Sequence, residues 1–267
     1  MITSKENELI KRIKALSQKK YRDEYKLYIV EGPKMVLEAL DYAEVSNIVI
    51  CEELLNDKKA LDSILAKASK RNVKVEYVNI KLFEWLSDTK TPQGTIALVK
   101  QNNNMLDLKS ILKDKTIFAL DKIQDPGNLG TIIRTLDSAG IKHLILSNDT
   151  ADPYNPKVVR STMGAIFRLK IYKLDVELKD VLQSLKENGA VVISTALDTK
   201  KYYYDINFDE NIVIVIGNES QGVSKEVQNI SNYKIKIPML GKTESLNAAV
   251  AASIIAYEKV RRQCTKE

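Results

Sequence analysis

The side chains that most often perform catalysis in enzymes are scarce in this sequence. Among its 267 residues are one histidine, His143, and two cysteines, Cys51 and Cys264, which lie far apart without the CxxC spacing of a zinc site. Ser-His-Asp or Cys-His chemistry would need His143 as its base, but His143 opens the apolar run 143–146, which is typical of a strand. The sequence therefore predicts a metal-free site built from Asn, Ser, Glu, Arg and backbone groups.

The common nucleotide-binding loops are absent as well. Residues 241–243 (Gly-Lys-Thr) look like the end of a P-loop, but Lys236 stands where the first glycine of that loop belongs. Residues 127–130 supply only GxxG and not the GxGxxG fingerprint of dinucleotide-binding domains. The usual phosphate-binding loops of α/β proteins are therefore excluded.

Three polar, glycine-containing segments stand out in the second half of the chain, at residues 120–134, 216–223 and 237–251. Each could be an ordinary connection when taken alone: a turn with a capped helix start, a loop with glycine at positive φ, and a second capped helix start. Their occurrence together in one chain is far more specific.

These segments resemble the three signature motifs of the SpoU–TrmH family of RNA ribose 2′-O-methyltransferases, in the SPOUT superfamily. The resemblance covers residues 116–260, and residues 29–34 (Ile-Val-Glu-Gly-Pro-Lys) resemble the start of the substrate-binding domain of its ribosomal RNA members. One departure is Ala249, where many members have a second serine. The matching motif residues are Asn128, Arg134, Asn218, Glu219, Gly222, Ser245 and Asn247.

The resemblance implies S-adenosylmethionine-dependent methyl transfer to a ribose 2′-hydroxyl of ribosomal RNA. A transfer RNA substrate is the first alternative, although members of that kind commonly lack the extra α/β domain. A non-catalytic RNA-binding factor of ribosome assembly is the second, and the retained motif side chains argue against it.

The resemblance also implies a deep trefoil knot near the C-terminus, a homodimer formed through the knotted domain, and S-adenosylmethionine bound in the knot by main-chain groups. The expected cofactor contacts are Thr195, Ala196, Leu197, Ile216, Gly217, Asn218, Gly222, Ile237, Met239, Ser245 and Leu246.

The expected catalytic residues are Arg134, Asn128, Glu219, Ser245 and Asn247. The family account often makes the arginine a base, but a guanidinium has a pKa above about 12, so we favour a clamp that stabilises negative charge on oxygen. Without the surrounding motifs, Arg134 would be expected to pair with Asp137 on the helix surface. Asn128 is expected to cap that helix and to position Arg134. Glu219 either accepts backbone N–H groups or is a solvated loop acid.

These residues must be positioned by an α/β architecture. The second half alternates helical patterns with strands expected at residues 116–120, 143–146, 169–172, 190–195, 211–216 and 233–237. This pattern predicts a mostly parallel sheet covered on both faces, with ligands beyond the carboxyl ends of its strands.

The first half predicts a smaller α/β domain, with strands at residues 27–30, 45–51, 73–78 and 95–100 and helices at 33–42, 58–71 and 81–87. The expected boundaries are a basic arm and RNA-binding domain at 1–105, a linker at 106–115 beside the polar stretch 101–104, and the methyltransferase domain at 116–267.

The net charge of +6 is concentrated near the N-terminus, where basic residues are interleaved with tyrosines. That segment is either an amphipathic helix with a solvated face or an arm that contacts phosphates. No apolar run approaches the length of a membrane helix and no signal sequence is evident, so a cytoplasmic location is expected. The candidate RNA contacts, whose alternative is solvated surface charge, are Lys11, Arg12, Lys19, Lys20, Arg22, Arg160 and Arg168.

Overall fold

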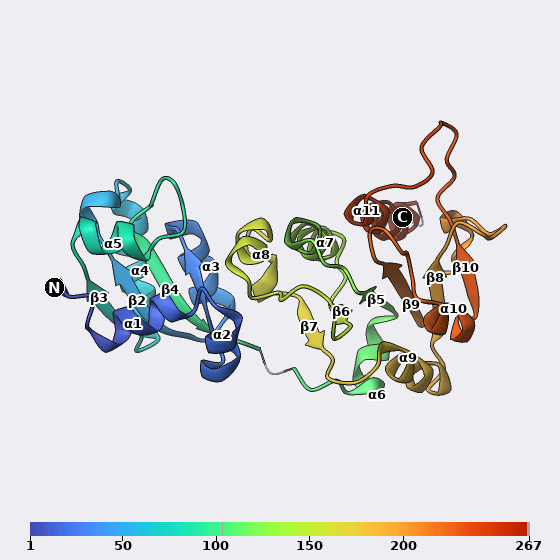
Figure 1. Cartoon of the computed structure of the whole chain (residues 1–267), viewed down its shortest axis with the longest axis horizontal. Coiled ribbons are helices and arrows are strands. Elements are labelled where there is room, and N and C mark those ends of the chain that lie inside the picture. Colours follow the sequence, from blue (N-terminus) through green and yellow to red (C-terminus); the bar gives the residue numbers. More distant parts are fainter. Residues whose placement is uncertain (103, 266–267) are drawn as a thin grey trace. The chain divides into compact units, whose positions relative to one another are not determined.

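The computed structural model describes residues 1–102 and 104–265 (Figure 1). It divides into two compact units, one of residues Met1–Asn102 with Asp152–Phe167, the other of Asn103–Ala151 with Arg168–Glu267. Asn103, within the stretch expected to begin the linker, and residues 266–267 lie outside the described residues.

The first unit is built on a four-stranded sheet of order β1-β4-β2-β3. The β2 and β3 strands are parallel, whereas β4 runs antiparallel to both β1 and β2. The strands are β1 (Leu27–Glu31), β2 (Val45–Ile50), β3 (Lys74–Tyr77) and β4 (Thr95–Lys100). The small α/β domain expected from the sequence is therefore present, with strand limits within a residue or so.

Three helices of the first unit, α1, α4 and α5, begin at a residue whose side chain caps the helix. Asn7 caps α1 by accepting from the N–H groups of Leu9 and Ile10, and Asp57 caps α4. Ile10 and Ile13 of α1 are buried, and so is Leu16, which follows the helix. These helices are α1 (Glu8–Ala15), α2 (Lys19–Tyr25), α3 (Pro33–Tyr42), α4 (Lys58–Lys70) and α5 (Ile80–Leu86).

A segment from the middle of the chain completes the first unit. Asp152–Phe167, which includes α8 (Pro156–Ser161), groups with the N-terminal residues, although it falls within the range 116–267 expected for the second domain. Arg22 forms a buried ion pair with Asp152 at 2.8 Å, and the rings of Tyr28 and Tyr154 lie 4.7 Å apart. The expectation of two continuous domains therefore missed a long-range interaction that no local pattern encodes.

The second unit contains a six-stranded sheet of order β10-β8-β9-β5-β6-β7. All of its strand pairs are parallel, which confirms the parallel sheet predicted from the alternating pattern. The strands are β5 (Thr116–Asp121), β6 (His143–Leu146), β7 (Lys170–Lys173), β8 (Val191–Thr195), β9 (Ile212–Gly217) and β10 (Tyr233–Ile235).

The helices of this unit are α6 (Leu108–Ile111), α7 (Pro126–Ser138), α9 (Leu178–Glu187), α10 (Lys225–Ile230) and α11 (Ala248–Cys264). The predicted linker at 106–115 is wrong, because α6 falls within it and Ile111 and Leu112 are buried with Leu182 and Val213 in the core of the unit. The helical pattern of these residues is weak, so it did not indicate that Ile111 and Leu112 would be buried.

Candidate active site

The three motif segments meet at the carboxyl edge of the six-stranded sheet. The β5 and β9 strands are neighbours, so the loops that follow them emerge side by side. The side-chain amide of Asn218, after β9, donates a 2.8 Å hydrogen bond to the carbonyl of Lys122, after β5. Segments nearly one hundred residues apart in sequence are thereby joined.

A continuous set of hydrogen bonds links one residue from each motif. Asn128 Nδ2 donates to Glu219 Oε1 at 2.8 Å, and Asn247 Nδ2 donates to Asn128 Oδ1 at 2.8 Å. Asn247 Oδ1 in turn accepts from the N–H of Ala249 at 2.9 Å and so caps α11, as expected. Asn128, in the first motif, is therefore hydrogen-bonded to one residue of the second motif and to one residue of the third.

Glu219 also binds the backbone at the start of α7. Its carboxylate accepts from the N–H groups of Gln124 at 3.4 Å and Asp125 at 3.3 Å, which matches the first of the two expectations for this residue. Burial would raise the pKa of Glu219, but the hydrogen bonds from Asn128 and from backbone N–H groups outweigh burial and lower it. The carboxylate is therefore charged at neutral pH.

The helix cap differs from the one expected. Asp125, and not Asn128, caps α7, because its side chain accepts from the N–H of Asn128 at 2.7 Å. Asn128 stands three residues inside the cap, which frees its side-chain amide for Glu219 and Asn247. The expectation that Asn128 caps this helix is therefore wrong, and its side chain is engaged in tertiary hydrogen bonds instead.

The loop after β9 is closed tightly. Asn218 and Gly222 exchange two backbone hydrogen bonds of 3.0 Å each, and Gly222 has φ +70°. A Cβ on Gly217 would overlap the backbone of Gly222 and Val223. Glycine is required at position 217 by this close approach and favoured at 222 by its positive φ.

Arg134 lies on α7, nearly two turns beyond Asn128, and is exposed. The alternative interpretation of Arg134, a surface pair with Asp137, does not apply, because Asp137 instead binds Arg168 at 2.8 Å. Within residues 1–102 and 104–265, no hydrogen bond or ion pair of the Arg134 guanidinium is found. Its donors are therefore available to a ligand.

The expected cofactor residues lie at the last positions of β8 and β9 and on the segments that follow β8, β9 and β10, three adjacent strands. The N–H of Ala196 donates to Ile235 O at 2.9 Å, which ties the end of β8 to that of β10. The chain from residue 236 to 247 then projects as a long loop before α11 (Figure 1). Ser245 and Leu246 are exposed on this loop, whereas Ile237 and Met239 are half-buried and Ile216 is buried.

Large apolar side chains are exposed at this same edge. Leu197 is 61% exposed and Leu240 99% exposed, on the loops after β8 and β10. Such side chains together with main-chain groups of these loops could hold an apolar ring that carries polar edges, such as adenine. The residues present therefore fit a nucleoside cofactor without a phosphate-binding loop.

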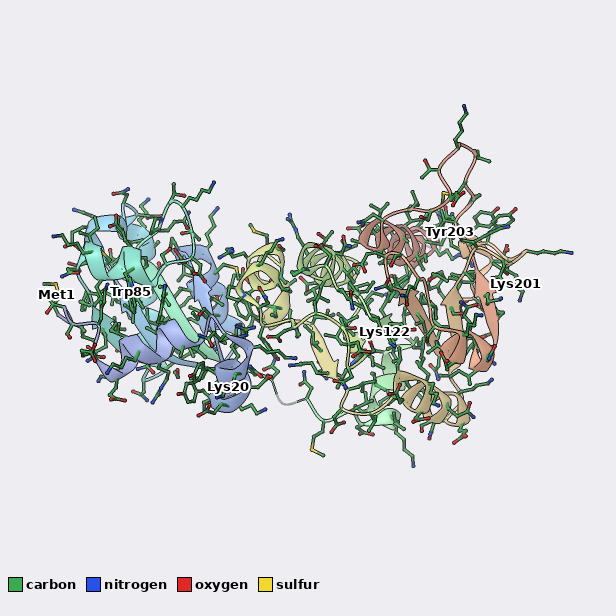
Figure 2. All side chains as sticks on the ribbon, in the orientation of Figure 1. Met1, Lys20, Trp85, Lys122, Lys201 and Tyr203 are labelled. Carbon is green, nitrogen blue, oxygen red and sulfur yellow. The ribbon has the colours of Figure 1, made fainter. Side chains whose placement is uncertain are left out.

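The candidate RNA contacts divide into accessible and inaccessible ones. Arg22 is only 2% exposed, and besides Asp152 it donates to the carbonyls of Leu16 and Ser17 at 2.8 Å. Arg22 is therefore a structural residue, and its assignment to RNA contact is wrong. Lys19 is exposed, as is Lys20 on α2 (Figure 2).

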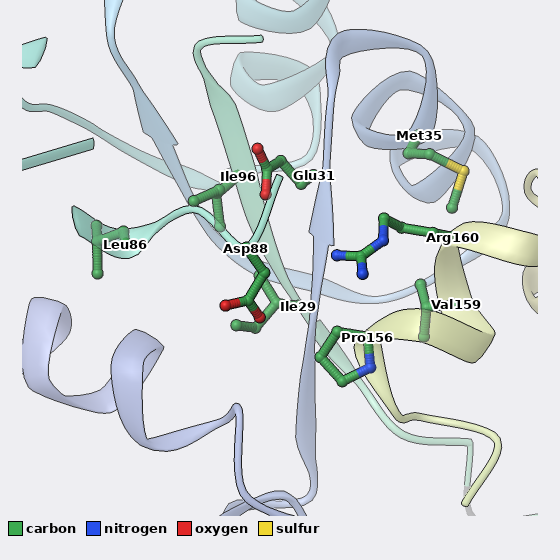
Figure 3. A pocket seen from close by; sticks show the side chains of 9 residues that line it. All are labelled: Ile29, Glu31, Met35, Leu86, Asp88, Ile96, Pro156, Val159 and Arg160. Atoms are coloured by element: carbon green, nitrogen blue, oxygen red, sulfur yellow. The ribbon is translucent and has the colours of Figure 1, made fainter. Parts of the chain in front are cut away.

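The other candidates keep accessible charge. Lys11 pairs with Glu6 at 2.6 Å, while Arg12 lies over the ring of Tyr25. Arg168 binds Asp137, as described above, and keeps part of its side chain exposed. Arg160 lines a small pocket of the first unit with Glu31 and Asp88 (Figure 3).

His143 is a core residue, as its strand setting indicated. It is 1% exposed, its Nδ1 lies 3.0 Å from the hydroxyl of Tyr172, and its Nε2 lies 2.7 Å from Asp114. Burial lowers the pKa of His143 even though Asp114 opposes the shift. Among the described residues no group of three or more His, Cys, Asp or Glu could hold a metal ion, and no helix is long and apolar enough to cross a membrane.

The second unit is an α/β domain with an all-parallel sheet, and its carboxyl edge carries the hydrogen-bonded set Glu219–Asn128–Asn247. Residues 115–257 match the SpoU rRNA Methylase family and residues 7–97 match the MRM3-like substrate binding domain. The chain belongs to the SpoU rRNA Methylase family.

Known proteins resemble the chain over nearly its whole length. The 23S rRNA (guanosine(2553)-2'-O)-methyltransferase RlmP of Bacillus subtilis is 32% identical over 96% of this chain and 97% of that protein. The structure of an AdoMet-bound rRNA methyltransferase from Sinorhizobium meliloti has a TM-score of 0.85 and 32% identity, over 98% of this chain and 97% of that one. The TrmH/SpoU tRNA modifying enzyme of A. aeolicus, with a TM-score of 0.51 and 29% identity, covers only 60% of this chain and 83% of its own.

Proposed function

We propose that this protein transfers a methyl group from S-adenosylmethionine to a ribose 2′-hydroxyl of ribosomal RNA. The observation that carries the proposal is the hydrogen-bonded set Glu219–Asn128–Asn247, which joins all three motifs at the start of the helix that bears Arg134. The similarity to RlmP and to an AdoMet-bound rRNA methyltransferase supports both the reaction and the cofactor.

S-Adenosylmethionine would be held by the loops after β8, β9 and β10, and when bound it supplies an electrophilic methyl group on sulfur. Leu197, Met239 and Leu246 would contact its apolar surface, and the backbone around Gly217 and Asn218 would bind its polar edges. Gly222 would keep the second loop closed. Thr195, Ala196, Ile216, Ile237 and Ser245 complete the proposed cofactor contacts.

Arg134 would act on the acceptor. A guanidinium is a planar cation with five N–H donors, so Arg134 is suited to bind the target phosphate or the 2′-oxygen and to stabilise the negative charge that develops there. The proton would leave through water. Asn128, Glu219 and Asn247 would act as positioning residues, because their mutual hydrogen bonds fix the start of α7, on which Arg134 lies.

Ribosomal RNA is favoured over transfer RNA by the first unit. The full-length similarities include proteins described as rRNA methyltransferases, whereas the tRNA modifying enzyme of A. aeolicus matches only 60% of this chain. Lys11, Arg12, Lys19, Lys20 and Arg160 would provide phosphate contacts from this unit. Such a substrate would place the protein in the cytoplasm.

We further propose that the protein forms a homodimer through the C-terminal region of its second unit, and that this region forms the trefoil knot of the family. Two observations on α11 support a partner there: Val250 and Tyr257 are 46% and 49% exposed, one heptad apart, and Ile254 between them is only half-buried. An apolar stripe of this kind is typical of an interface.

The proposal is tested by mapping ribose methylation across the ribosomal RNA of cells with and without the gene for this chain. Loss of one modified position, restored by the wild-type protein and not by Arg134→Ala, would support it. An unchanged ribosomal RNA map together with a lost modification in transfer RNA would move the substrate to the alternative class.

A further inference from the structure

A large cavity lies at the edge of the six-stranded sheet opposite the proposed active site. Residues that precede β5, β6 and β9 line it, including Lys115, Lys142 and Asp209, and so does Lys259 near the end of α11. Its volume is about 650 Å³, within the usual size range of ligand sites. α7 starts at the proposed active site and ends near Gly140 in the cavity wall, so about 20 Å of helix separates the two sites.

Basic side chains dominate the lining of this cavity. They are Lys113, Lys115, Lys142, Lys259, Arg261 and Arg262, against the carboxylates of Asp114 and Asp209. Some are neutralised within the protein: Lys142 binds Asp114 at 2.6 Å, and both arginines bind Glu258 at 2.8 Å. In the part of the chain that the structure describes, no ion pair is found for Lys113, Lys115 or Lys259.

The remaining positive charge is not well accommodated by the protein alone. Lys259 is half-buried, and burial together with the charge of Lys142 lowers its pKa, although Asp114 acts in the opposite direction. A bound anion would relieve this repulsion.

The donors open to a ligand in this cavity are its lysines. Thr116 also lines the cavity, but its Oγ1 is shielded from solvent, as are the unpartnered hydroxyls of Thr95 and Ser194 elsewhere in the chain, so it is not counted among these donors. Lysine ammonium groups form charge-assisted hydrogen bonds with phosphate oxygens.

We propose that this cavity is a phosphate-binding site, and that its phosphates belong to the backbone of the RNA on which the enzyme acts. The RNA assignment rests on the proposed function, whereas phosphate binding does not. The site would hold the RNA on the side of the sheet away from the methyl-transfer centre and would add affinity without contacting a base.

The phosphate site is tested with inorganic pyrophosphate and three forms of the full chain. These are the wild type, Lys115→Gln/Lys259→Gln, and the charge-matched control Lys179→Gln/Lys225→Gln, whose lysines are exposed on α9 and α10. Calorimetry should show binding by the wild type and the control, and at least tenfold weaker binding by the cavity variant. Equal affinity in all three, or no binding by the wild type, would overturn the proposal.

The source of the phosphate is tested by fluorescence anisotropy on a 23S ribosomal RNA transcript at several salt concentrations. Each phosphate contact contributes about 0.7–0.9 to the slope of log K against log salt, so the cavity variant should lose about 1.4–1.8 and the control should lose little. If pyrophosphate binding is lost but the slope is unchanged, the ligand is a free phosphorylated molecule. Because neither measurement needs methyl transfer, this proposal and the proposed function can fail separately.

Discussion

Replacing Asn128 tests whether the hydrogen bonds at the carboxyl edge support catalysis. Asn128→Ala removes the 2.8 Å bonds to Glu219 and from Asn247. A bond to a charged group contributes about 1.5–3 kcal/mol and a neutral one about 0.5–1.5 kcal/mol, and the lower ends apply here because water can reach both groups. The combined loss is about 2 kcal/mol.

If that energy holds Arg134 and the cofactor loops in the reactive arrangement, kcat/KM should fall about thirtyfold, since each 1.36 kcal/mol is a factor of ten. The assay is transfer of a labelled methyl group to ribosomal RNA, with thermal unfolding measured in parallel. Gln183→Ala is the matched control, because it removes a similar 2.9 Å amide–carboxylate bond, to Glu187, on the exposed face of α9. A kcat/KM within twofold of wild type for Asn128→Ala would refute the reasoning.

Asn128→Asp sharpens the same test. The lowered pKa of Glu219 means that two carboxylates would face each other at neutral pH and repel. Asn128→Asp should therefore be less active than Asn128→Ala at pH 8. The difference should narrow as the pH falls and one carboxyl group takes up a proton, and a pH-independent ratio of the two variants would contradict this.

Further substitutions test other parts of the structure. Arg134→Ala should abolish methyl transfer with little change in S-adenosylmethionine affinity by calorimetry. Arg134→Lys should recover little activity, because lysine lacks the planar guanidinium group. If Arg134→Ala lost cofactor binding together with activity, Arg134 would not have the catalytic role. Arg22→Met or Asp152→Asn should each destabilise the protein by about 3–5 kcal/mol in denaturant unfolding, because each leaves a buried partner uncompensated. The double variant Arg22→Met/Asp152→Leu should lose less stability than either single variant. Losses that simply add in the double variant would contradict a buried ion pair. Arg261 and Arg262, opposed by burial, lower the pKa of Glu258 to about 2. The stability that the charged carboxylate contributes should therefore be present above about pH 4.5 and lost as the pH falls toward 2. Glu258→Gln should remove this pH dependence from the free energy of unfolding, and an unchanged pH profile in the variant would contradict the prediction.

Sequence patterns predicted the strands well because burial and alternation are local signals. The runs at residues 143–146 and 95–100 became β6 and β4 with the same limits. The core setting of His143 followed from the same kind of pattern. The three motif segments also converge as the resemblance implied, since parallel strands bring their carboxyl ends to one edge.

Long-range partners were beyond such patterns. Nothing in the sequence around Arg22 shows that Asp152, 130 residues away, will bury it, or that Asp125 and not Asn128 will cap α7. The same long-range packing determines what truncation would do. Deleting residues 1–105 would strip the packing from Tyr154, Val159 and Phe167, which are buried in the first unit, so the remaining chain would not be an intact methyltransferase domain.

The most direct test of the central claim is nucleoside analysis of ribosomal RNA after incubation with the full chain and S-adenosylmethionine in the presence of a chelator. Mass spectrometry should detect one 2′-O-methylated nucleoside with the wild-type protein and none with Arg134→Ala. A methyl group on a base, or equal ribose methylation by both proteins, would contradict the account.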